Sequence, residues 1–228
     1  MRMRVIFGTD ESVKYVGHLD LARAWERAIR RAGLPLSYSQ GFHPQPRIQF
    51  AAALPVGVTG AAEVMDIYLD EEIDPDDFLA RLDPALPRGI RPTSAAPVPK
   101  DLPSLQSTIC GASYGVEVET DDPDAAFCAR IEAFLARPSA WRERRRGDRL
   151  ARYDLRPLVE GIRYRGTCEL GQAFDTDMRS EPGATGRPDE LLAELGFEAS
   201  ARRIERLSLA FAGEKSEANH TEMMNCGY

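Results

Sequence analysis

The sequence lacks the spaced cysteines that form zinc or redox sites. Only four of its 228 residues are cysteine: Cys110, Cys128, Cys168 and Cys226. No two of them form a CxxC pair, which argues against a zinc ribbon or a thioredoxin-type centre and favours reduced thiols. The sequence also has no GxGxxG, P-loop, iron–sulfur cluster or GxSxG motif. We therefore expect no metal and no cofactor of its own.

Long apolar runs are also missing. No stretch of about 18 apolar residues occurs, so no membrane span is expected. The basic start Met1–Arg4 is followed by only three apolar residues before Gly8 and Asp10, which is too few for a signal peptide. Hydrophobic residues make up 43% and charged residues 29% of the chain, values typical of a globular protein. These features predict a cytoplasmic protein.

Charge is distributed unevenly along the chain. The formal net charge is −7, yet residues 1–60 carry a net charge of +4 and residues 136–165 carry +6. Two basic segments in an otherwise acidic chain indicate an anionic partner at those segments.

The first half of the chain predicts the order β-α-β-β-α-β. The clearest element is a helix at 18–32, in which Leu21, Trp25 and Ile29 belong to one apolar stripe and Gly33 is placed to end the helix. A second helix is expected at 74–82, with Asp74 as N-cap and Pro75 in its first turn. Strands are predicted at 4–8, 36–39, 47–53, 63–69 and 89–97.

The second half predicts a comparable set of elements. Helices are expected at 122–135 and 187–195, and strands at 113–119, 141–146, 151–158, 161–165, 168–175 and 203–211. The fold class is therefore predicted to be α+β, with two ferredoxin-like βαββαβ halves in tandem. The expected boundaries are half 1 at 1–97, a linker at 98–112, half 2 at 113–212 and a disordered tail at 213–228.

The first helix has a second stripe, formed by arginines opposite its apolar face. These are Arg23, Arg27, Arg30 and Arg31, with Asp20 and Glu26 as the local acids. Guanidinium groups crowded on two turns suit phosphate, because the planar fork donates two parallel hydrogen bonds. The alternative is an ordinary solvated helix face.

The segment from Ser39 to Arg47 contains two prolines and predicts a stiff loop. In it, Phe42 and His43 could stack on a base and Arg47 could hold a phosphate. The alternative is a rigid turn between strands with Phe42 buried.

Histidines offer weak catalytic candidates. His18 and His43 could together cleave RNA by acid–base chemistry, with Asp20 beside His18 in sequence, but the sequence does not bring the two imidazoles together.

A basic cluster follows Trp141. On a strand, Arg142, Arg144 and Arg146 would share one face and could contact phosphates. A solvated hairpin tip that discourages edge-to-edge aggregation is the alternative.

Several segments together resemble the radical-SAM-linked protein family. They are Gly17–Asp20, Trp25–Pro35, Tyr38–Ile48, Leu54–Val58, Glu63–Asp66 and Tyr153–Leu158. The resemblance covers nearly all of the chain before the tail. It implies a domain of unknown function that is fused to, or encoded beside, a radical SAM protein, which would supply the cluster and the SAM. The chain departs from the family's loop, Phe-Asn-Pro-His-Pro, because His43 replaces the Asn and Gln45 replaces the His.

The leading hypothesis is an accessory module that binds an RNA substrate, tRNA or rRNA, and presents it to a radical SAM partner. It is not expected to be an enzyme on its own. One alternative is a metal-independent RNA-processing nuclease that uses His18. The other is a scaffold subunit that binds protein only.

Overall fold

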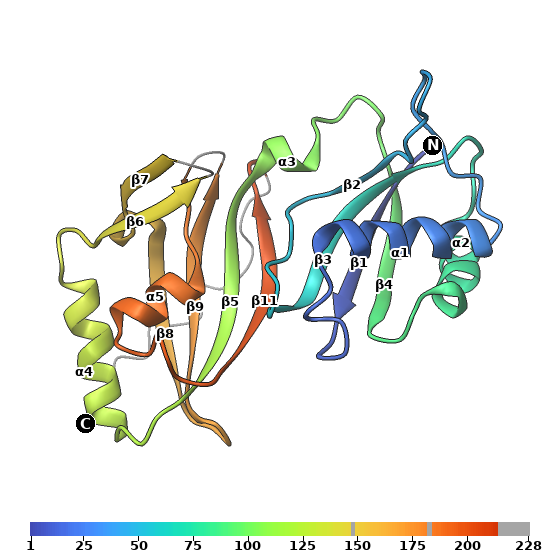
Figure 1. Ribbon diagram of the computed structural model, residues 1–228. Helices are drawn as coiled ribbons and strands as arrows, with labels where there is room; N and C mark the ends of the chain where they lie inside the picture. Colours follow the sequence, from blue (N-terminus) through green and yellow to red (C-terminus); the bar gives the residue numbers. More distant parts are fainter. Residues whose placement is uncertain (147–148, 182–183, 214–228) are drawn as a thin grey trace. The chain divides into compact units, whose positions relative to one another are not determined.

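The computed structural model describes residues 1–146, 149–181 and 184–213, and it has a mixed α and β architecture with few helices (Figure 1). Two compact units make up these residues. Unit 1 is Met1–Ile109 with Arg206–Ala212, and unit 2 is Cys110–Glu205 with Gly213. The strand pairs named in the next paragraphs are all antiparallel.

Unit 1 has the element order predicted for the first half. The elements are β1 (Arg2–Thr9), α1 (His18–Arg31), β2 (Ile48–Phe50), β3 (Thr59–Tyr68), α2 (Pro75–Leu82), the 3-10 helix η1 (Asp83–Ala85), β4 (Ile90–Val98), the short helix α3 (Leu105–Thr108) and the later part of β11 (Arg202–Phe211). Strand β1 lies between β3 and β4, and β3 also pairs with β2.

The core of unit 1 forms where α1 packs on the sheet. The stripe Leu21, Trp25, Ala28 and Ile29 is buried as predicted, and the Trp25 ring meets the Phe7 ring edge-on at 4.9 Å between centroids. The helix ends because Gly33 adopts φ 64°, a conformation that glycine tolerates best. Asp74 caps α2, with its side chain accepting hydrogen bonds from the Asp76 and Asp77 backbone N–H groups.

Unit 2 departs from the predicted second half. Its elements are β5 (Ile109–Glu119), α4 (Asp124–Leu135), β6 (Trp141–Arg146), β7 (Arg149–Asp154), the 3-10 helix η2 (Arg156–Leu158), β8 (Val159–Thr167), β9 (Gly171–Glu181), β10 (Ala184–Thr185), α5 (Pro188–Glu194) and the start of β11. Strand β9 pairs with β5, β8 and β10, while β6 and β7 form a separate two-stranded ribbon. Because this order is not β-α-β-β-α-β, the tandem of two ferredoxin-like halves is not confirmed.

Three expected elements differ in detail. The strand expected at 36–39 is reduced to the isolated bridges Leu36↔Leu69 and Tyr38↔Pro46, because Pro44 and Pro46 have no backbone N–H to extend a ladder. The strand expected at 151–158 ends at Asp154, where a 3-10 turn containing Pro157 follows. The expected linker 98–112 contains α3 and the first residues of β5.

No helix among the described residues is both long and apolar enough to cross a membrane. The disordered tail expected at 213–228 lies outside the described residues from 214 onward.

Candidate functional site

The arginine face of α1 is exposed and only partly neutralised. Arg23 pairs with Asp20 at 3.0 Å, and Arg30 approaches Glu26 at 4.0 Å. Arg31 donates a hydrogen bond to the Ala85 carbonyl rather than to an acid. Arg27 is exposed, and no partner among the described residues contacts its guanidinium. The face therefore presents four cations to solvent against two carboxylates, both supplied by α1 itself.

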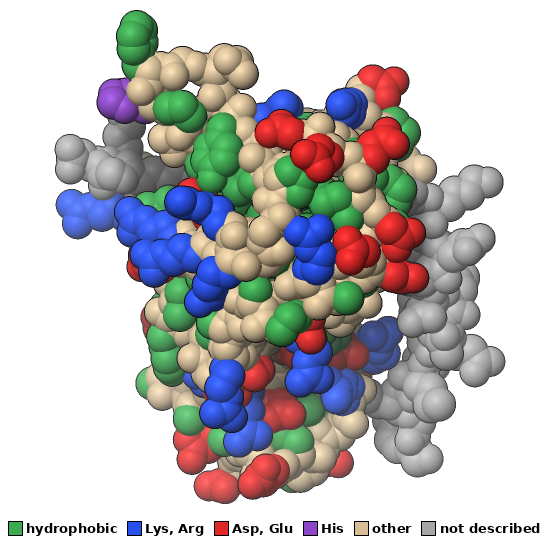
Figure 2. Space-filling view, turned by 90° about the vertical axis from the view of Figure 1, so that its right-hand side faces the viewer, with side chains coloured by type: hydrophobic (Ala, Val, Ile, Leu, Met, Phe, Trp, Pro, Cys, Tyr) green, Lys and Arg blue, Asp and Glu red, His purple; other side chains and the backbone are tan. Residues whose placement is uncertain are grey.

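Figure 2 views the molecule from the side on which α1, α2 and β4 lie, and shows Lys and Arg side chains in several groups with Asp and Glu side chains between them. On α1 itself, Arg23, Arg27 and Arg30 follow one another at intervals of four and three residues, and like charges at that helical spacing repel one another in the absence of an anion. A bound polyanion would relieve that repulsion, so the face is suited to phosphate.

The Ser39–Arg47 loop is closed at its base and open at its tip. Ser39 N–H donates to the Gln45 carbonyl at 2.8 Å, and the Gln45 N–H donates to Ser39 Oγ at 2.9 Å. Gly41 adopts φ 133° at the turn. Phe42 is fully exposed and His43 is exposed too, so the expectation of a buried Phe42 is wrong. In Figure 1 this segment projects beyond the strands of unit 1.

Arg47 does not project freely from the loop. Its guanidinium lies 4.0 Å from the centroid of the Tyr68 ring, a cation–π distance. The side chain is nevertheless exposed, so the stack orients the guanidinium while leaving its donors open to solvent.

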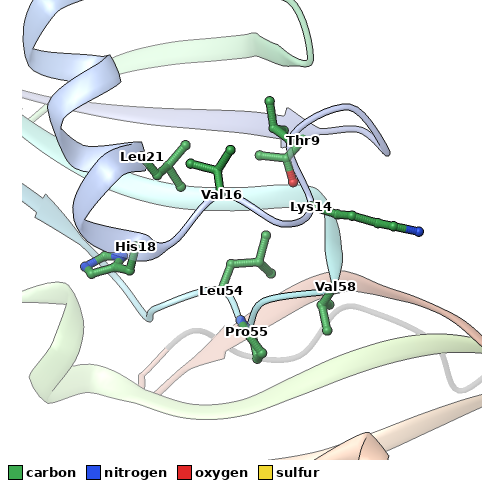
Figure 3. A pocket seen from close by; sticks show the side chains of 9 residues that line it. Thr9, Lys14, Val16, His18, Leu21, Leu54, Pro55 and Val58 are labelled. Carbon is green, nitrogen blue, oxygen red and sulfur yellow. The ribbon is translucent and has the colours of Figure 1, made fainter.

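His18 lies apart from that loop, in the wall of a shallow hollow at the start of α1 (Figure 3). The space measures about 270 Å³, including the open solvent at its mouth. Val16, Leu21, Leu54 and Pro55 are among the side chains that line it. Lys14 extends away from it in the same view.

The imidazole of His18 packs edge-on against Phe50, with 5.1 Å between ring centroids. Its Nδ1 is buried and has no hydrogen-bond partner among the described residues. No described contact joins His18 to His43 or to Asp20, so the structure does not assemble the catalytic candidates into one site. Two segments that carry the family resemblance, Gly17–Asp20 and Leu54–Val58, do meet at this hollow.

Four exposed hydrophobic side chains, Tyr15, Val16, Leu19 and Val56, belong to the segments that supply the lining of the hollow, and they are called the apolar rim below. Exposed apolar side chains that form a patch mark contact sites for other molecules more often than isolated ones do. Sequence patterning did not reveal this rim, because its residues come from two loops and a helix start.

Two arginines of the second basic segment, which were expected to contact phosphates, form ion pairs within unit 2. Arg142 forms an ion pair with Glu194 at 2.8 Å, and Arg144 bonds to both carboxylate oxygens of Glu190. The pKa of the Arg142 guanidinium is raised, chiefly by hydrogen bonding to Glu194. Burial acts to lower the pKa of Arg144, but the hydrogen bond and charge of Glu190, together with Tyr153, raise it overall. These two arginines do share a face, as predicted, but that face binds α5. The side chain of Arg146 lies outside the described residues.

Two buried ion pairs in unit 1 were not predicted. Arg2 and Asp66 bond to each other inside the sheet, and Glu63 of β3 pairs with Arg206 of β11. Arg206 also donates to the Ala52 and Ala53 carbonyls, which fixes the backbone leading to Leu54. A charged residue on a strand is normally expected to be exposed to solvent. The sequence around these four residues contains no feature that identifies them as buried.

Among the described residues, no group of three or more His, Cys, Asp or Glu side chains could hold a metal ion. The candidate features of unit 1 are the arginine face of α1, the exposed Phe42 of the Ser39–Arg47 loop and the hollow beside His18.

Comparisons with solved structures give remote similarities. The chain is 11% identical to a chain of a Cbf5–Nop10–Gar1 complex with a TM-score of 0.48, covering 91% of this chain and 48% of that one. An archaeal box H/ACA Nop10–Cbf5 complex gives 11% identity and a TM-score of 0.44, covering 90% and 46%. The chain therefore spans about half the length of these structures.

No curated protein matches the chain. A family model described as "Uncharacterized protein conserved in bacteria (DUF2344)" matches residues 2–187, which is most of the sequence. The chain belongs to this DUF2344 family.

Proposed function

We propose that this protein is an RNA-binding accessory module, which holds a tRNA or rRNA substrate for a partner enzyme. The observation that carries the proposal is Arg27, an exposed guanidinium without a partner among the described residues, placed among three further arginines on α1. A face with unsatisfied positive charge gains free energy by releasing the counterions condensed on a nucleic acid.

The Ser39–Arg47 loop adds a contact of another kind. Phe42 is fully exposed on a loop whose base is fixed by hydrogen bonds. An exposed aromatic ring can stack on an unpaired base, and such stacking contributes roughly 1–3 kcal/mol per base. Arg47, oriented by Tyr68, supplies a donor for a neighbouring phosphate. This combination favours single-stranded or looped RNA over a regular duplex.

The partner is proposed to be a radical SAM protein, as the family resemblance implies. Its docking surface would be the apolar rim, of which Tyr15, Leu19 and Val56 are the most exposed side chains. The partner would bring the cluster and SAM, and this chain would contribute binding and orientation of the RNA. The interaction is testable with a Leu19→Lys variant, which places a charge in the rim without altering the core.

Two observations favour binding over cleavage by this chain. His18 packs against Phe50 in the hollow, and no other candidate acid or base contacts it among the described residues. A metal-independent nuclease that uses His18 would need two such groups at the scissile phosphate.

The experiment is RNA affinity across a salt series, for the wild type and for a variant in which Arg23, Arg27 and Arg30 are each replaced by Glu. The wild type should show a steep salt dependence, with each phosphate contact adding about 0.7 to the logarithmic slope for a single strand. The variant should lose most of that slope. Equal affinity and slope for both proteins would contradict the proposal.

A further inference from the structure

The β6–β7 ribbon of unit 2 has two chemically different faces. Arg142 and Arg144 point to α5, where Glu194 and Glu190 neutralise them. Side chains alternate along a strand, so Trp141, Glu143 and Arg145 belong to the opposite face. The register places Glu143 opposite Arg152 and Arg145 opposite Leu150, and all of these side chains are exposed.

The outer face carries an exposed tryptophan. Trp141 is 57% exposed, whereas the other tryptophan of the chain, Trp25, is completely buried. The guanidinium of Arg152 lies 4.6 Å from the centroid of the Trp141 ring, and Leu150 is exposed on the same face. Arg145 has no partner among the described residues. An exposed indole with one arginine stacked on it, and a second arginine four residues further along the same strand face, is a combination suited to single-stranded nucleic acid.

The face of the ribbon that carries Arg142 and Arg144, its inner face, holds the ribbon in place against α5. The ion pairs of Arg142 and Arg144 attach β6 to α5, and the Asp154 carboxylate accepts a hydrogen bond from the Ala140 N–H at 2.7 Å. A stacking residue on a fixed strand loses less conformational entropy on binding than one on a loose loop. The inner arginines therefore orient the ribbon, and the outer face remains available for a ligand.

We propose that the outer face of the ribbon is a second RNA site, at which an unpaired base stacks on Trp141 while Arg145 and Arg152 hold the adjacent phosphates. The proposal rests on the proposed function in that RNA is the ligand. A single-stranded RNA fits better than an apolar protein surface, because covering Arg145 and Arg152 with apolar groups would leave two charges without partners. Glu143, the exposed acid of this face, opposes phosphate and limits the affinity.

The test uses tryptophan fluorescence with a short unlabelled oligouridylate. Because Trp25 is fully buried, a change in emission on binding reports on Trp141. We expect saturable quenching in the wild type and none in Trp141→Leu, with the affinity of that variant reduced roughly 5-fold or more. Glu143→Gln should bind more tightly than the wild type, an increase that misfolding cannot produce.

The same titration in an Arg27→Glu/Arg30→Glu background separates the two sites. Quenching that persists there at higher RNA concentration supports the ribbon site even if the α1 face plays no part. In the wild type, binding that is detected by anisotropy of a fluorescein-labelled oligouridylate without any quenching of tryptophan emission overturns the ribbon site and leaves the α1 face standing. The absence of both signals in the wild type overturns the ribbon site together with the proposed function.

Discussion

Arg2 donates hydrogen bonds from Nε and Nη2 to Oδ2 of Asp66, and both side chains are almost completely buried in unit 1. Arg4 shares the same carboxylate, and Arg2 also donates to the Leu102 and Pro103 carbonyls. One carboxylate thus pairs with two guanidiniums, and Arg2 attaches the segment after β4 to β1.

Asp66→Ala should destabilise the protein by about 3–5 kcal/mol, because it leaves a buried arginine without its counter-ion. Chemical denaturation measures this loss of unfolding free energy. Asp101→Ala removes an exposed carboxylate from the same unit and should change stability by no more than about 0.5 kcal/mol. Similar effects of the two substitutions would show that the buried pair does not stabilise the fold.

Adjacent arginines of β6 should have opposite roles. Arg144→Met removes the bidentate pair with Glu190 and should cost roughly 1.5–3 kcal/mol of stability, with little effect on RNA affinity. Arg145→Met, its exposed neighbour, should weaken RNA binding and leave stability nearly unchanged. Thermal unfolding and RNA titration on both variants check this pair, and a reversed pattern would contradict the assignment of the two faces.

The Tyr153 hydroxyl should titrate well above the usual tyrosine pKa. Burial, together with the Glu190 carboxylate, raises the pKa of its hydroxyl to about 12 from a usual value of 10.0. The unfolded state releases this proton first, so the contribution of Tyr153 to stability is complete below pH 10 and is lost as pH rises toward 12. Tyrosinate absorbance of the wild type and of Tyr153→Phe measures it. Loss of a component with an ordinary tyrosine pKa in the variant would refute the prediction.

The Asp10–Gly17 loop beside the hollow should depend on Gly89. This residue adopts φ 92°, and a Cβ there would lie 2.2 Å from Ser12 Oγ. Gly89→Ala should therefore destabilise the protein by at least about 1–3 kcal/mol. Gly17→Ala is the matched control, since a Cβ at that position meets nothing within 4 Å. Denaturation midpoints that fall equally for both would contradict this account of the loop.

Local interactions were the predictable part of this structure. The apolar stripe of α1, its end at Gly33 and the Asp74 cap were all predicted from residues within a few positions of each other. These features depend on helical spacing and backbone conformation, which the sequence displays directly.

Long-range pairing was the unpredictable part. Arg142 and Arg144 were expected to face phosphate, yet Glu194 and Glu190 lie 52 and 46 residues further along the chain. The Arg2–Asp66 pair spans 64 residues. The residues next to a charged strand residue in the sequence do not show whether it forms a buried ion pair with a distant residue. An arginine on a strand is therefore expected to be exposed, and only the tertiary structure shows otherwise.

The arginine face of α1 is proposed to bind RNA. The most direct test compares two variants of unit 1 with equal changes in net charge: Arg27→Glu/Arg30→Glu on α1, and Arg88→Glu/Arg91→Glu at exposed arginines outside that face. We predict that the α1 variant loses at least about 10-fold in RNA affinity at moderate salt, while the other variant loses far less. Equal losses would show that net charge alone governs binding, and they would contradict the claim.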